Sequence, residues 1–514
     1  RGGFVENIYV ERVRANVKRQ ALYCDMLGSA RWVGELAQRY PAREITPLTP
    51  WFANISIHDV EITGCSTLVD VSALPEKPVK NFFFGNVKAH CDRIGKICDA
   101  TKFSMKDVRI ESCDTVMRID NCDYASFFGF SNVTTGSSVK IEKTGGECRY
   151  LNVQTYPLVP VNYQSIRPGE VWLDTEGKPI QAHGFQVTFR EGKYYWYGED
   201  KTHTLFGTNR MFGGVRCYSS TDFYNWKDEG RIIEPATDPH SPLHHCQKLE
   251  RPHILYCAKT GRYVCWLKSQ SNDGHFVILE AEHFMGPYHF VRNLKPNGFA
   301  VGDFDMYADP DTGKGYVWFE RPHWEQICAE LSDDYTNVNG RYSEHFVGKV
   351  PPFTREAAAH FVMDGKHYIY TSGTTSYTPN PSEVAVFDDY HGEYTVLGNP
   401  HIGDEYAHSF CSQITSVIKI PGKDLYVAMA DRWLPHTNKT DIPKKDWQSF
   451  LTRYKDHRPY PKDFATPKVA DRFYTLVNPN QDVYKATYVF LPIVVKDGIP
   501  MIEWKDEWKL ENYE

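Results

Sequence analysis

Five polar residues recur at corresponding points of five similar stretches of this sequence, and together they could bind and cleave a polar substrate. They are His183, Glu250, Asp303, Glu356 and Gln413, and each stands just ahead of an apolar run. Carboxyl groups held close together repel one another, which raises the pKa of at least one and supplies a general acid near neutral pH. A single such residue is most simply a solvated charge at the end of a sheet. Recurrence at five equivalent points instead predicts a functional site.

The stretch around Glu356 shows how such a residue is positioned. Residues 355–381 read REAAAHFVMDGKHYIYTSGTTSYTPNP, so that Glu356 precedes an apolar strand and a turn at Asp364-Gly365 returns the chain along a Tyr-rich strand. This pattern predicts a β-hairpin. Four further hairpins of the same type are expected at 184–200, 251–267, 305–320 and 414–433.

Five such units over residues 170–514 predict a five-bladed β-propeller, whose inner strands point one end at a central cavity. The closing segment 487–510 is expected to supply the strands that complete the ring. Aromatic residues such as Trp196, Trp433 and Trp504 could line the cavity, although aromatics in propeller strands more often pack between blades.

Residues 1–150 follow a different repeat. Alternating apolar residues, then Asn, Asp or Glu, then a hydrophobic residue recur at 6–13, 53–62, 80–89, 102–110 and 127–135. The later copies lie roughly 21 to 27 residues apart, which is typical of the rungs of a parallel β-helix. The sequence therefore predicts an all-β chain: a partial right-handed parallel β-helix at 1–150, a Pro-rich linker at 151–169 and the propeller at 170–514.

Composition excludes several classes of partner. The net charge is −7, without a Lys/Arg stripe, which argues against nucleic acid. No run of about 18 apolar residues exists, so no membrane span is expected. The chain opens without Met or signal peptide, which indicates a processed or truncated product. No cofactor motif or metal-ligand spacing occurs, and we expect no cofactor or metal. A neutral, polar substrate fits best.

Residues 170 to about 510 resemble glycoside hydrolase family 43, and most of all its exo-β-1,3-galactanase-like subgroup. The motifs that carry the resemblance are WLDTEGKPIQAHG, YYWYGEDK, ERPHILYCAKTGRYV, DFDMYADPDTGKGY, REAAAHF with TSGTTSYTPNP, SQITSVIKIPG and DRW. The resemblance implies hydrolysis with inversion, in which an acid protonates the leaving oxygen and a base activates water, the two groups being about 6.5 to 9.5 Å apart.

By motif match, the resemblance also implies the role of each residue. Glu356 is the general acid, Asp303 tunes its pKa, and Glu250 and Glu199 bind sugar hydroxyls. Most members of the family carry an Asp base on the first blade, where this chain has His183. Gln413 matches a water-positioning glutamine of the subgroup, which is the interpretation we favour over one in which it only satisfies backbone groups of the channel. The remaining substrate-binding residues expected are Thr374, Tyr377, Asp273 and His183.

Two departures bear on the sugar. Asp273 stands where the subgroup usually has a Tyr, and Tyr377 stands where it usually has a Trp. At the other end of the chain, the opening RGGFVENIYVERV resembles the C-terminal rungs of glycoside hydrolase family 28. The paired-aspartate, Gly-His-Gly and Arg-Ile-Lys motifs of that family do not occur here, so this domain is expected to be catalytically silent.

The resulting prediction is an exo-β-1,3-galactanase that acts on a polysaccharide or oligosaccharide such as arabinogalactan. One alternative is an α-L-arabinofuranosidase or β-xylosidase of the same fold. The other is a propeller that binds glycans without cleaving them, since the first-blade base is missing. A polysaccharide substrate implies a secreted, periplasmic or cell-surface protein.

Overall fold

The structure is a computed structural model of the chain. It describes residues 3–149, 151–155, 161–202, 204, 211–270, 274–349, 353–375, 377, 379–433 and 483–514. The chain divides into two compact units, which are described separately. The first comprises Arg1–Val161 with two added tripeptides, and the second comprises the rest of Asn162–Glu514. No helix in these described ranges is long and apolar enough to cross a membrane.

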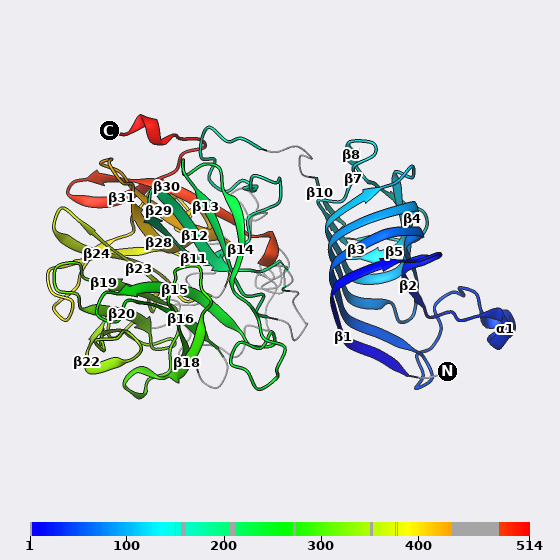
Figure 1. The fold of residues 1–514 in the computed structure, drawn as a ribbon, viewed down its shortest axis with the longest axis horizontal. Helices are drawn as coiled ribbons and strands as arrows, with labels where there is room; N and C mark the ends of the chain where they lie inside the picture. Colours follow the sequence, from blue (N-terminus) through cyan, green and yellow to red (C-terminus); the bar gives the residue numbers. More distant parts are fainter. Residues whose placement is uncertain are drawn as a thin grey trace. The chain divides into compact units, whose positions relative to one another are not determined.

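Unit 1 contains a ten-stranded sheet in which parallel pairing predominates (blue to cyan in Figure 1). Its strands are β1 (Phe4–Asn16), β2 (Gln20–Asp25), β3 (Trp51–Ser72), β4 (Val79–Glu111), β5 (Val116–Asp123), β6 (Ser126–Phe128), β7 (Ser131–Asn132), β8 (Ser137–Ser138), β9 (Lys140–Lys143) and β10 (Asn152–Gln154). A short helix, α1 (Ala30–Val33), lies between β2 and β3. β1 pairs with β3, β3 with β4, and β4 with β5, β6 and β7, all in parallel.

The sequence repeat corresponds to the pairing of these strands. Partners lie 27 residues apart at the start of the β3–β4 ladder and 22 apart between β4 and β5. Two residues with positive φ, five positions apart, recur in successive copies: Asn7 and Arg12, Asn54 and Asp59, Asn81 and Asn86, Lys102 and Asp107. Asn and Asp tolerate this left-handed conformation best among non-glycine residues, which explains why they mark the repeat.

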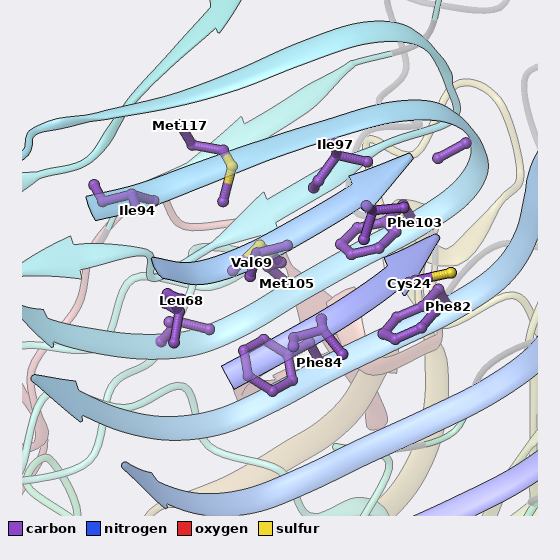
Figure 2. Close-up of a cluster of buried hydrophobic side chains, with 14 of the residues drawn as sticks. Cys24, Leu68, Val69, Phe82, Phe84, Ile94, Ile97, Phe103, Met105 and Met117 are labelled. Carbon is purple, nitrogen blue, oxygen red and sulfur yellow. The ribbon is translucent and has the colours of Figure 1, made fainter. Parts of the chain in front are cut away.

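The asparagines of the repeat also bond one another. The amide nitrogen of Asn81 donates to the side-chain oxygen of Asn54 at 2.9 Å, and that of Asn54 donates to Asn7 at 3.1 Å. The residues between these points pack inward, and Phe82 and Phe103 stack at 4.9 Å in the core drawn in Figure 2. The parallel repeat is thus present, while a right-handed β-helix stays a prediction because the pairings establish only the sheet.

Unit 2 is a five-bladed β-propeller, as predicted, and its blades are successive antiparallel sheets (green to red in Figure 1). Blade one holds β11 (His183–Arg190), β12 (Lys193–Glu199), β13 (Val215–Ser220) and β14 (Lys227–Ile233). Blade two holds β15 (Leu249–Cys257), β16 (Arg262–Ser269), β17 (His275–Ala281) and β18 (His289–Leu294). Blade three holds β19 (Phe304–Ala308), β20 (Gly315–Glu320), β21 (Gln326–Leu331) and β22 (Val338–His345).

Blades four and five complete the ring. Blade four holds β23 (Glu356–Met363), β24 (Lys366–Ser372), β25 (Glu383–Phe387) and β26 (Thr395–Gly398). Blade five holds β27 (His401–Ile402), β28 (Gln413–Lys419), β29 (Tyr426–Arg432), β30 (Thr487–Lys496) and β31 (Ile499–Glu503). The five predicted hairpins are the first two strands of blades one to four and β28 with β29 in blade five, and the closing segment supplies β30 and β31 as expected.

The junction of blades one and five is tightly packed. Trp196 and Phe490 lie 4.9 Å apart between ring centroids, and Trp172 packs on both in a shared core. Ile166 and Trp508 exchange backbone hydrogen bonds of 2.8 and 3.0 Å, which bind the two ends of this unit together. Trp196 is therefore an inter-blade core residue, as most propeller aromatics are.

Candidate active site

Every blade brings two side chains to the same end of the propeller. One stands at the start of the innermost strand and the other at the end of the second strand, opposite it. The pairs are His183 with Glu199, Glu250 with Lys268, Asp303 with Glu320, Glu356 with Ser372, and Gln413 with Asp431. The sequence predicts the first column in full, and from the second it predicts Glu199.

A β-bulge follows the first residue in three of these pairs. The register shifts directly after His183, Glu250 and Glu356, and the next residue has a positive φ in each case. These residues are Gly184 at 54°, Arg251 at 52° and Ala357 at 49°. A bulge re-aims the side chains beside it and is common next to active sites. At blade one the position admits only glycine, because a Cβ on Gly184 would lie 2.4 Å from a carboxylate oxygen of Glu199.

A cavity of about 780 Å³ opens between the described ends of the blades. Of the predicted site residues, its wall holds Glu199, Glu250, Asp303, Glu356, Tyr377 and Gln413. Of residues that were not predicted, it holds Lys248, Arg251, Lys268, Gln270, Glu320 and a rim formed by Phe299, Arg321 and Trp324. A volume of this size is within the range of small-ligand sites, which is about 300 to 1,000 Å³.

Glu356 and Gln413 are in direct contact. The amide nitrogen of Gln413 donates to Oε1 of Glu356 and to Oγ of Ser372, each at 3.1 Å. The amide oxygen accepts from Arg251 at 3.0 Å and from the Trp433 indole at 3.1 Å. Guanidinium and indole N–H groups can only donate, so the oxygen must face them and the nitrogen must face Glu356. The carbonyl oxygen of a protonated carboxyl group is its better acceptor, so this hydrogen bond to Oε1 favours a Glu356 proton on Oε2.

The pKa of Glu356 is raised well above its ordinary value. Burial is the largest cause, and the negative charges of Asp303 and Glu320 add to it. Lys268 and Arg251 oppose the shift without cancelling it. The raised pKa favours the protonated form of Glu356, which is the state that a general acid requires.

Asp303 remains ionised beside this acid. Burial alone would raise its pKa, but Arg251 and Lys268 hold the pKa below its ordinary value. The contacts are close: Nε of Arg251 lies 2.9 Å from one oxygen and Nζ of Lys268 lies 2.6 Å from the other. Two carboxyl groups in one wall thus have pKa values pushed in opposite directions, a pattern typical of catalytic pairs.

Glu250 shares the lysine that holds Asp303. Nζ of Lys268 lies 2.6 Å from Glu250, and the Gln270 amide donates to Glu250 at 2.9 Å. Burial would raise the pKa of Glu250, but Lys268, Lys248 and Lys201 outweigh it and lower the pKa. An ionised, well-anchored carboxylate of this kind is suited to accept hydrogen bonds from sugar hydroxyls.

Glu199 and Tyr377 form the wall on the first and fourth blades. Glu199 pairs with Lys201 and accepts the backbone N–H of Arg251 at 2.9 Å, and burial raises its pKa. Tyr377 lies 5.1 Å from Trp433 between ring centroids, and burial raises the pKa of its hydroxyl, which therefore stays protonated. Trp433 also lines the cavity, whereas Trp504 packs on Phe410.

The structure places two predicted residues, His183 and Thr374, away from the cavity wall. His183 is absent from the cavity wall: its side chain is fully buried, with Nδ1 at 2.9 Å from Asp431. Thr374 is buried as well and shares a 2.7 Å hydrogen bond with Thr354. Asp273 lies outside the described residues.

The residues that sequence reasoning missed are mostly partners across a hairpin. Lys268, Glu320 and Asp431 lie at the end, or one residue before the end, of β16, β20 and β29. Counting forward from each glycine turn would have located them opposite the predicted column. Arg251 follows Glu250 directly in the ERPH motif, and only its bulge brings its side chain to Asp303 and Gln413.

Comparisons with known proteins agree with this geometry. Residues 185–417 match the family model described as glycosyl hydrolases family 43. A family 43 β-1,3-galactosidase is similar at 27% identity and a TM-score of 0.55, over 68% of this chain and 65% of that one. A second β-1,3-galactosidase, solved with galactodeoxynojirimycin, is similar at 28% identity and a TM-score of 0.53, over 67% of this chain and all of that one.

A third structure supports the fold alone. The exo-β-1,3-galactanase of Clostridium thermocellum is 24% identical, with a TM-score of 0.52, over 67% of this chain and 66% of that one. A search of curated proteins returned no match. No comparison bears on the likeness of residues 1–150 to family 28, which stays a prediction. Within the propeller unit, residues 185–417 are thus similar to the glycosyl hydrolases of family 43.

Proposed function

We propose that this protein is an exo-acting glycoside hydrolase that releases galactose from β-1,3-linked galactan with inversion of configuration. The observation that carries the proposal is that Glu356, with a raised pKa, and Asp303, with a lowered pKa, line one cavity of a domain similar to family 43. The choice of galactose is supported by the similarity of this chain to two β-1,3-galactosidases, at 27% and 28% identity.

In the proposed reaction, Glu356 donates the proton on Oε2 to the glycosidic oxygen. The bond between that oxygen and the anomeric carbon breaks, and its electron pair stays on the leaving oxygen. A water attacks the anomeric carbon from the opposite face and releases a proton to solvent water, and Glu356 regains a proton from solvent, so that the protons balance over the cycle. Asp303 keeps Glu356 protonated until this step, and Glu250 and Glu199 hold the hydroxyls of the terminal sugar.

Gln413 has a part in this proposal as the residue that orients water. Its two amide hydrogens and its oxygen are already engaged by four neighbours. It must therefore exchange one of these hydrogen bonds when substrate and water enter. Replacing Gln413 by Ala should remove most turnover, by about 100-fold. A rate close to that of the wild type would rule out both water orientation and the fixing of Glu356.

The released sugars test the substrate. Incubation with arabinogalactan, arabinan and xylan should yield galactose alone, and the Glu356→Gln variant should yield none. Arabinose or xylose in place of galactose would establish the α-L-arabinofuranosidase or β-xylosidase alternative. Binding of galactan without any product would establish a glycan-binding propeller instead.

The proposal includes a location outside the cytoplasm. A branched polysaccharide cannot enter a cell intact, so an enzyme that attacks it from the end must meet it in the periplasm, at the cell surface or in the medium. Fractionation of the source cells, with the protein detected by antibody, checks this location. Recovery in the cytoplasm alone would contradict it.

A further inference from the structure

An aromatic and cationic cluster forms the outer rim of the cavity on blade three. Trp324, Arg321 and Phe299 all line the cavity, and the Trp324 side chain is 63% exposed. The Arg321 guanidinium lies 5.5 Å from the centroid of Trp324 and 5.7 Å from that of Phe299. The cluster continues outward to Tyr342, whose ring meets Phe299 edge-on at 5.3 Å and is 43% exposed. We call these four residues the rim platform.

The loop that carries the rim platform is held in place by its own hydrogen bonds. Residues 321–325 join β20 to β21, and the N–H of Arg321 donates to the carbonyl of Glu325 at 3.0 Å. The Arg321 guanidinium also pairs with the Glu325 carboxylate at 2.8 Å. The N–H of His323, a residue with φ of 64°, donates to Glu320 at 2.6 Å. A surface fixed in this way loses little conformational entropy when a ligand binds.

The cavity therefore has two chemically different parts. Around Glu250, Asp303 and Lys268 it is buried and densely charged, with each of these residues less than one-tenth exposed. At Trp324 it is aromatic and open. An exo-acting enzyme must enclose the terminal sugar and let the rest of the chain leave through an opening. The platform lies on blade three, next to the blade that carries the acid Glu356.

We propose that the rim platform binds the pyranose units on the leaving-group side of the cleaved bond, and so makes the enzyme selective for chains over single sugars. This inference rests on the proposed function and adds the length of the substrate to it. The C–H face of a pyranose packs on Trp324 as an apolar surface does, while Arg321 offers N–H donors to ring hydroxyls.

Binding to an inactive background isolates this role. The Glu356→Gln variant is titrated by calorimetry with galactose, β-1,3-galactobiose and β-1,3-galactotriose. The expected Kd falls as the chain lengthens. Adding Trp324→Ala should raise the Kd for galactotriose by about 10-fold and change the Kd for galactose by no more than about 2-fold. Trp324→Phe should restore part of the difference, because a smaller ring still stacks.

Tyr256→Ala in the same background is the matched control. Tyr256 is 47% exposed and lies six residues along β15 from Glu250, about 20 Å from the cavity end of that strand. It should leave all three affinities unchanged. Equal affinity for galactose and galactotriose, or equal weakening of both by Trp324→Ala, would overturn the platform.

The outcomes separate this inference from the proposed function. If the wild type releases galactose but Trp324→Ala leaves the affinity for galactotriose unchanged, the rim platform is refuted and the proposed function stands. If instead only xylose or arabinose oligomers bind, the choice of galactose fails. In that case the titrations are repeated with the monosaccharide, disaccharide and trisaccharide of the sugar that binds. The rim platform is supported if affinity rises with chain length in the Glu356→Gln variant and no longer does so after Trp324→Ala is added.

Discussion

Blades one and four begin in the same way and put their first residue to different uses. His183 and Glu356 each start an innermost strand, and each is followed by a bulge with a positive φ. Glu356 opens onto the cavity, whereas His183 faces Asp431 and the ring of Tyr488 in a fully buried site. The hairpin thus places the first residue of each innermost strand at the same end of the propeller. Contacts with the neighbouring blade then determine whether that residue lines the cavity, as Glu356 does, or is buried between blades, as His183 is.

The largest expected effect is the loss of activity when Glu356, and not His183, is replaced. Gln matches the shape of Glu and the neutral form that the raised pKa of Glu356 favours, so Glu356→Gln should fold normally. Its kcat/KM on β-1,3-galactan should fall by about 10³-fold, as expected when a general acid is lost. Galactose release against time measures the loss, and a loss below about 10-fold would refute the assignment.

The same substitution should alter the pH dependence of stability. A carboxyl group with a raised pKa stabilises the fold below its ordinary pKa of about 4.3, and this contribution is lost as pH rises toward the folded-state value. Glu356→Gln removes this pH-dependent loss of stability, because Gln does not ionise. The variant should therefore gain stability relative to the wild type between pH 5 and pH 8, and denaturant titrations at the two pH values measure the gain. Parallel behaviour of the two proteins would contradict a raised pKa.

The matching change in blade one should affect stability instead. His183→Ala removes a 2.9 Å hydrogen bond from Asp431 and leaves a cavity in a buried site. A buried polar group that loses its partner, together with the cavity, costs about 3 kcal/mol. Denaturation followed by Trp fluorescence measures this cost. The folded fraction should keep kcat within about 3-fold of the wild type, because the imidazole does not line the cavity. A large loss of kcat with normal stability would make His183 a catalytic residue.

A smaller effect is expected at the carboxylate that tunes the acid. Asp303→Asn removes a negative charge that raises the pKa of Glu356, and it frees Lys268 and Arg251 to lower that pKa further. The alkaline limb of kcat/KM should therefore move to lower pH. A limb that stays in place or moves to higher pH would show that Asp303 does not act on Glu356.

The smallest effect is expected at Glu320. Burial raises the pKa of Glu320 to about 7, so it is only partly charged when Glu356 works. Glu320→Gln should shift the alkaline limb in the same direction as Asp303→Asn, but by less. A larger shift than that of Asp303→Asn would reverse the order of influence on the acid.

Much of the propeller could be predicted because its signals are local. The glycines of the hairpin turns, such as Gly365 at φ 74° and Gly422 at φ 74°, mark where each pair of strands reverses. Polar residues ahead of the apolar runs then fall at strand starts, and β11, β23 and β28 begin at His183, Glu356 and Gln413. In unit 1, Asn and Asp marked the repeat because they adopt positive φ.

What could not be predicted depends on contacts between distant segments. His183 and Asp431 are 248 positions apart and meet only because the first and last blades adjoin. Nothing in the QAHG motif reveals that this histidine is enclosed. The rim platform was missed for a related reason: Phe299, Arg321 and Tyr342 come from three segments of blades two and three, and only their packing against Trp324 makes a surface.

The role of Glu356 as the acid is tested most directly by changing the leaving group. A 2,4-dinitrophenyl β-galactoside departs without protonation, whereas galactose as a leaving group needs a proton. Glu356→Gln should cleave the aryl galactoside within about 10-fold of the wild type and lose about 10³-fold on β-1,3-galactobiose. An equal loss on both substrates would contradict the account, because Glu356 would then be needed for something other than protonating the leaving oxygen.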